Sequence, residues 1–163
     1  MNVDPLKRAT LSAVIEHNLA QLQRLNGQLE SLLPILDRPP CEYRDLAAIA
    51  YLLHNIYSAI ENSFDQISRT FENHIVDTQR WHRELLDKMF LNIAGVRPAV
   101  LPDNLRSPLN DLRGFRHLFR HSYDFELDSN RLRDLTRRWS DLFPMLGDAF
   151  EKFRSWLLSE DTG

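Results

Sequence analysis

Apolar residues recur at intervals of three and four along almost the whole chain, a spacing that places them on one side of an α-helix. In the first 36 residues one apolar residue returns every seven positions: Ile15, Leu22, Leu29 and Leu36. The chain has only five glycines, which are few for a sandwich or barrel with many tight turns. The pattern therefore predicts an all-α protein.

Breaks in these stripes divide the chain into predicted helices. The first covers about residues 4 to 36, where Pro34 should bend or end it, and the second covers about residues 42 to 73. A third, shorter helix begins near Thr78 and is expected to carry four apolar residues on one side: Trp81, Leu85, Met89 and Ile93.

Capping residues predict where the last two helices begin. Ser107 followed by Pro108 reads as an N-cap with proline at the first helical position. Asp128 can cap a fifth helix, in which Pro144 and Gly147 are expected to produce a kink or a split. We expect one domain, residues 1–163, folded as an antiparallel bundle of four to five helices.

Composition excludes several classes of protein. Cys41 is the only cysteine, so the chain has no internal disulfide and no zinc site of paired cysteines. Neither GxGxxG nor GxxxxGKS/T occurs. The N-terminus lacks the apolar core of a secretory signal, and no window approaches the roughly 18 apolar residues of a membrane helix. We therefore expect a cytoplasmic protein without a membrane segment.

The basic residues are strongly biased toward arginine. The net charge is −3, yet only three of the 20 basic residues are lysine, and nine arginines lie between Arg97 and Arg138. Arginine suits bidentate phosphate contacts better than lysine does. A GC-rich genome would produce the same bias, so both explanations stay open.

Residues 116–123, RHLFRHSY, concentrate the reactive side chains of the predicted fourth helix. Arg116 carries a permanent positive charge, His121 can exchange protons near neutral pH, and Tyr123 offers a phenol that can be modified. Cleavage of RNA by attack of the 2′-hydroxyl needs a proton acceptor, a proton donor and a group that stabilises the negative charge developing on the phosphate. Arginine and histidine supply these without a metal or another cofactor.

Helical geometry separates the two groups. Five residues at roughly 100° each place Arg116 and His121 about 140° apart around an ideal helix, whereas Arg116 and Tyr123 lie on the same side. Either the helix distorts near its end or a second copy of the chain supplies the matching group. The spacing therefore favours a homodimer.

The segment RGFRHLFRHSYDFELD, residues 113–128, resembles the motif region of HEPN-domain proteins, specifically the HepT-like ribonuclease toxins. Their signature is Arg, four residues, His, one residue and Tyr, which Arg116, His121 and Tyr123 fill in order. YLLHNIYSAIENSF (51–64) and WHRELLDKM (81–89) add similarity, and the resemblance covers about residues 10 to 155.

This resemblance implies a HEPN-like fold and a metal-independent endoribonuclease toxin of a bacterial type VII toxin–antitoxin system. Arg116 and His121 would be catalytic in a cleft between two subunits, and the substrate would be RNA, which is tRNA for some members. A minimal nucleotidyltransferase antitoxin would transfer AMP from ATP to Tyr123. That modification would bring a phosphate against Arg116.

Other interpretations of these residues remain open. Arg113, His117 and Arg120 fit RNA-phosphate contacts or merely solvated or interface charge. The chain would alternatively be a non-catalytic nucleotide- or substrate-binding module that assists a nucleotidyltransferase, or a structural dimer whose arginine face meets an acidic partner. If the second helix faces the fourth, Glu61 is expected to form a structural salt bridge with one of the arginines.

Overall fold

The computed structural model describes residues 3–72, 81–121 and 126–159. These residues form five α-helices and one short 3₁₀ helix: α1 (Pro5–Leu36), α2 (Tyr43–Glu72), α3 (Trp81–Lys88), η1 (Asp103–Leu105), α4 (Arg106–His121) and α5 (Ser129–Ser159). No strand occurs among the described residues, so the predicted all-α class is confirmed.

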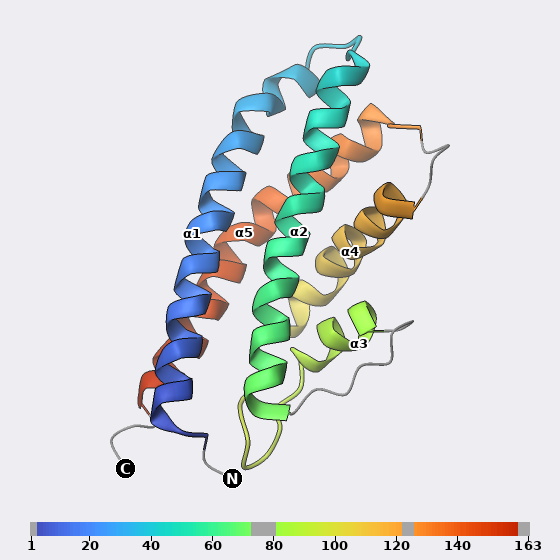
Figure 1. The fold of residues 1–163 in the computed structure, drawn as a ribbon. Helices are drawn as coiled ribbons and strands as arrows, with labels where there is room; N and C mark the ends of the chain where they lie inside the picture. Colours follow the sequence, from blue (N-terminus) through green and yellow to red (C-terminus); the bar gives the residue numbers. More distant parts are fainter. Residues whose placement is uncertain (1–2, 73–80, 122–125, 160–163) are drawn as a thin grey trace.

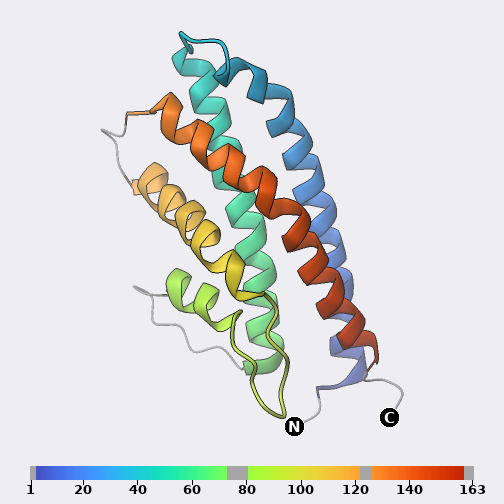
Figure 2. The same cartoon turned by 180° about the vertical axis from the view of Figure 1, so that it is seen from behind.

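Three long helices form one side of the molecule. Figure 1 shows α1 and α2 side by side in opposite directions. Figure 2, the view from the opposite side, shows α5 crossing them diagonally. The predicted apolar stripes of these helices point into this layer, and Ile15, Ile56 and Trp139 are completely buried in it. The shorter α3 and α4 lie against α2 on the side away from α1.

Polar side chains tie the long helices together at two places. The Arg8 guanidinium on α1 donates to the backbone oxygens of Leu157 (2.9 Å) and Trp156 (3.3 Å), which lie in the last turn of α5. In the middle of the layer, the Asn18 amide of α1 donates to the Ser63 hydroxyl of α2 at 2.9 Å. Asn18 therefore interrupts the apolar stripe without leaving its amide N–H unpaired.

The third helix ends earlier than the sequence predicts, while its predicted start near Thr78 lies outside the described residues. It ends at Lys88, and the backbone oxygen of Met89 accepts the N–H groups of Val100 (2.9 Å) and Leu101 (3.0 Å). Ile93 lies in an isolated antiparallel bridge with Arg97 rather than in the helix. Its place on the apolar stripe was therefore a wrong prediction, because the chain turns back on itself at Gly95, whose φ is +74°.

Arg97 explains how this irregular segment is fixed. Its side chain is fully buried and forms an ion pair with Glu72 of α2. The same guanidinium donates to the backbone oxygens of Lys88, Leu91 and Pro98. One arginine thus satisfies three carbonyls of a loop that has few backbone partners of its own.

The predicted starts of α4 and α5 differ in accuracy. α4 begins at Arg106 after the 3₁₀ turn η1, so Ser107 and Pro108 lie inside its first turn and Ser107 is not the cap. Asp128 does cap α5, because its carboxylate accepts the Asn130 N–H at 2.9 Å.

Of the kink or split predicted for α5 at Pro144 and Gly147, the split is wrong. The helix continues from Ser129 to Ser159. Leu142 and Leu146, which lie on either side of the proline, are both buried in the core. Packing of this apolar face outweighs the loss of one backbone hydrogen bond.

Candidate functional site

The inner face of α4 packs against α2 and includes a buried arginine. The spacing of Leu112, Phe115 and Phe119 assigns them to the core face of this helix and places Arg116 at the edge of that face. Leu112 and Phe115 are buried, and Phe119 is partly buried. Only 8% of the Arg116 side chain is exposed, so it lies deeper than an edge position.

Arg116 is held by an ion pair with Glu61 of α2. Its Nη2 lies 2.9 and 3.0 Å from the two carboxylate oxygens of Glu61, and its Nη1 donates to the Ser58 hydroxyl at 3.3 Å. The guanidinium carbon also lies 4.9 Å from the centre of the Tyr57 ring, within the range of a cation–π contact. The expected pairing of Glu61 with an arginine of α4 is confirmed.

A histidine from α3 completes this cluster. The Nδ1 atom of His82 lies 2.9 Å from each carboxylate oxygen of Glu61 and 3.0 Å from Nη2 of Arg116. Glu61 is 6% exposed and His82 is 35% exposed. We call Glu61, His82 and Arg116 the junction cluster, because each comes from a different helix.

The Tyr57 phenol borders the junction cluster without belonging to its hydrogen bonds. Its ring is fully buried, and its hydroxyl has no hydrogen-bond partner among the residues that the structure describes. Burial, with the nearby negative charge of Glu61, raises the pKa of Tyr57 far above its usual value. The phenol therefore stays neutral, and its ring serves as an apolar wall beneath the guanidinium.

His54 lies one turn before Ser58 on the same face of α2. Its ring packs against Phe119, with 5.7 Å between the ring centres. Burial, together with the positive charges of Arg116 and Arg120, lowers the pKa of His54 below its usual value. His54 is therefore a partly buried histidine at the edge of the core.

His121 does not join Arg116 in this structure. Both are described residues, and none of the hydrogen bonds, ion pairs or ring contacts found among the described residues connects them. His121 is exposed in the last turn of α4, where its ring lies 4.7 Å from that of His117. The predicted angular separation of Arg116 and His121 is thus present.

The other predicted site residues of this helix lie at its surface or outside the described residues. His117 and Arg120 are exposed, and Arg113 is half-buried and donates to the Asn110 side chain at 3.3 Å. Tyr123 lies outside the described residues. His82 was not selected from the sequence, because no periodic signal brings the start of α3 to the middle of α2.

The arginine bias of the segment from Arg97 to Arg138 is largely structural. Five of its nine arginines form ion pairs with carboxylates: Arg97, Arg106, Arg116, Arg133 and Arg138. These ion pairs connect α3, α4 and α5 to each other and to α1 and α2. The bias therefore gives little support to a broad phosphate-binding surface.

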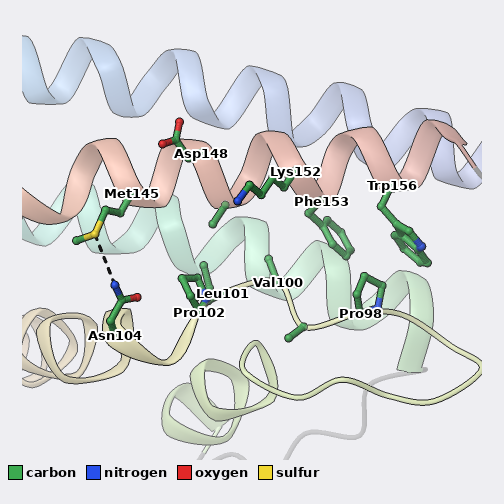
Figure 3. A pocket seen from close by; sticks show the side chains of 12 residues that line it. Pro98, Val100, Leu101, Pro102, Asn104, Met145, Asp148, Lys152, Phe153 and Trp156 are labelled. Carbon is green, nitrogen blue, oxygen red and sulfur yellow. Dashed lines mark hydrogen bonds between the residues drawn. The ribbon is translucent and has the colours of Figure 1, made fainter.

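A pocket of about 670 Å³ lies away from the junction cluster (Figure 3). Its walls are the loop around Val100 and the face of α5 that carries Phe153 and Trp156. Among the described residues, Lys152 is the only cation that lines it. Such an apolar lining is unsuited to a polyanion. Among the described residues, no group of three or more acidic, histidine or cysteine side chains could bind a metal ion.

Membrane insertion finds no support in the described helices. None of them combines the length and the apolar character needed to cross a bilayer.

Comparison with known proteins identifies the family. No curated protein matches the chain. Residues 48–157 match the family described as HepT-like protein, which is more than half of the chain and spans all three helices of the junction cluster. The resemblance expected from the motif in α4 is confirmed, and the chain belongs to the HepT-like family.

Proposed function

We propose that this protein is the endoribonuclease toxin of a bacterial type VII toxin–antitoxin pair and that it cleaves RNA, with tRNA as one candidate, without a metal. The family match supports the toxin assignment. The observation that supports the chemistry best is the position of Arg116, which is buried and held in place by its ion pair with Glu61. A cation fixed in this way can stabilise negative charge on a phosphate with little reorganisation.

In this proposal Arg116 stabilises the charge that develops on the phosphate, and His121 transfers a proton. Arg113, His117 and Arg120 would contact neighbouring phosphates of the RNA. Because His121 points away from Arg116 on the same helix, the complete site would form between two protomers. Each protomer would act as one domain in the cytoplasm.

The regulatory part of the proposal concerns Tyr123, two residues beyond His121. A minimal nucleotidyltransferase antitoxin would transfer AMP from ATP to its hydroxyl. The added phosphate would place negative charge near the RNA-binding cations. Cleavage would then stop because the phosphate site is occupied and its positive potential is reduced.

Expression in cells tests the toxin assignment. Wild type should arrest growth and degrade RNA, whereas His121→Ala should do neither. His17→Ala is the matched control, since His17 is exposed on α1, and it should behave as wild type. Equal growth and intact RNA with wild type and His121→Ala would contradict the proposal.

A mixed dimer tests whether two protomers share a site. Arg116→Lys and His121→Ala should each be nearly inactive alone. Co-expression should restore about a quarter of wild-type activity, because half of the dimers are mixed and each mixed dimer has one intact cleft. Activity no higher than that of the separate variants would exclude a shared cleft.

Intact-mass analysis tests the modification. Co-expression with a minimal nucleotidyltransferase of the same genome should add whole AMP units to the wild type and none to Tyr123→Phe. An unchanged wild-type mass would remove the regulatory claim while leaving the nuclease claim standing.

A second function is favoured by one specific observation. The charge of Arg116 is already paired with Glu61 in a buried site, as expected for a non-catalytic module that binds a nucleotide or substrate for a nucleotidyltransferase. Such a protein would bind ATP or its partner tightly and leave RNA intact when pure and unmodified.

A further inference from the structure

Cleavage of RNA through its 2′-hydroxyl needs two proton transfers, and a single histidine from the motif of α4 supplies only one group for them. The structure places a second histidine in contact with Arg116. His82 comes from α3 and lies outside the motif, and its Nδ1 is 3.0 Å from Nη2 of Arg116, the cation that the proposed function uses for the phosphate.

The contacts of His82 determine which of its nitrogens is free. Nδ1 lies 2.9 Å from both oxygens of Glu61, so a proton on Nδ1 is donated to the carboxylate. Nη2 of Arg116 donates to the same carboxylate. Because both nitrogens bind the same two oxygens, Nη2 and Nδ1 lie close together. The neutral ring then has its lone pair on Nε2.

The exposed fractions show that His82 is the most accessible member of the junction cluster. His82 is 35% exposed, whereas Glu61 and Arg116 are 6% and 8% exposed. No hydrogen bond to Nε2 is present among the described residues. The junction cluster is therefore open to solvent mainly through the imidazole.

Glu61 is placed as a carboxylate that orients a catalytic histidine. A buried carboxylate fixes the tautomer of the ring and stabilises the imidazolium that forms when Nε2 takes a proton. Within the part of the chain that the structure describes, the charged groups in contact with the ring are Glu61 from α2 and Arg116 from α4. Glu61 carries one negative charge, so the cluster is neutral before the reaction and carries one net positive charge after the ring takes a proton.

We propose that His82 is the general base of the RNA cleavage reaction and that Glu61 is its positioning residue. Nε2 takes the proton of the 2′-hydroxyl, and the 2′-oxygen forms a bond to phosphorus. The bond from phosphorus to the 5′-oxygen breaks, and protonated His121 donates its proton to that oxygen. The products are a 2′,3′-cyclic phosphate and a 5′-hydroxyl. This assignment rests on the proposed function.

His82→Asn is the sharpest variant. The asparagine amide can replace Nδ1 as the donor to Glu61, so the buried carboxylate keeps a partner, but no group replaces Nε2. The matched control is His17→Asn on the exposed face of α1. Thermal melting checks folding, and His82→Gln serves as a second variant if His82→Asn melts more than a few degrees below wild type.

Cleavage of a labelled RNA by purified protein should fall roughly 10²–10⁴-fold in His82→Asn, with RNA binding within about threefold of wild type. The decline of wild-type activity toward low pH should flatten in the variant, since the base that must be deprotonated is gone. His17→Asn should match wild type in both respects.

A modified substrate separates the two histidines. RNA with sulfur in place of the bridging 5′-oxygen has a leaving group that needs no proton. His121→Ala should recover most of its activity on this substrate, whereas His82→Asn should not.

Two failures are distinguishable. Wild type that leaves RNA intact overturns the proposed function and this assignment together. Wild type that cleaves RNA while folded His82→Asn cleaves it within about threefold and with the same pH profile overturns the assignment of His82 alone. Recovery of His82→Asn on the sulfur substrate would also overturn it, because His82 would then be the acid.

Discussion

Two neighbouring residues of α2 belong to regions that differ in kind. Ile60 is completely buried in the apolar layer with α1 and α5, whereas Glu61 is buried in the junction with α3 and α4. The apolar layer is stabilised by many small contacts that hardly depend on orientation. The junction depends on a few charged atoms that must all be present. The fold can therefore tolerate change in the first region far better than in the second.

The largest expected effect is at the junction. Arg116→Met should lower the free energy of unfolding by about 3 kcal/mol, because it leaves the Glu61 carboxylate buried with only His82 as partner. Adding Glu61→Leu should restore most of this loss, since no buried charge then remains. Urea denaturation of the single and double variants measures both effects. Additive losses would show that the junction is not a coupled charge site.

A smaller effect is expected at the polar pair inside the apolar layer. Ser63→Ala should cost about 2 kcal/mol, because the Asn18 amide then loses its buried acceptor. The double variant Asn18→Leu, Ser63→Ala should be close to wild type in denaturant unfolding. If Ser63→Ala left the free energy of unfolding unchanged, the apolar layer would tolerate an unpaired Asn18 amide. The two regions would then differ even more in their tolerance of a lost polar partner.

Ile60→Val should have a still smaller effect. The loss of one methyl group in the core should cost about 1 kcal/mol, by the same amount at pH 5.5 and pH 7.5. Chemical denaturation at the two pH values provides the measurement. A cost above that of Arg116→Met would invert the comparison between Ile60 and Glu61.

The smallest expected effect concerns pH. Because the pKa of His54 is lowered from its usual 6.5 in the folded protein, the unfolded chain binds this proton more readily. Its contribution to stability is therefore complete above about pH 6.5 and is lost as pH falls below that value. Between pH 7.5 and 5.5, His54→Gln should lose less melting temperature than wild type. The control His17→Gln should lose as much as wild type, and equal losses in all three would contradict the prediction.

The apolar layer could be predicted from the sequence, and the junction could not. Spacing places Leu22 and Ile56 in the core because a helix converts sequence distance into a direction. The same rule places Arg116 near the inner face of α4, but it does not show which side chain of another helix meets it. His82 reaches Glu61 only because α3 folds back against α2, and this depends on the loop that Arg97 fixes.

Local sequence was also a weak guide to helix ends. Ser107 and Pro108 have the residue types of a helix start, yet α4 follows the 3₁₀ turn η1 directly and begins at Arg106, two residues before Pro108. Pro144 lies within a continuous α5 because the faces on both sides of it are buried. In both cases tertiary packing outweighs a local preference.

If the junction cluster belongs to a metal-independent ribonuclease, the purified, unmodified protein should cleave a defined RNA in excess EDTA. We expect products with 2′,3′-cyclic phosphate ends, and no cleavage when the nucleotide before the cut carries a 2′-deoxy substitution. Analysis of the 3′ ends is the measurement. Intact RNA, or cleavage that leaves 3′-hydroxyl ends, would show that the junction cluster has no such role.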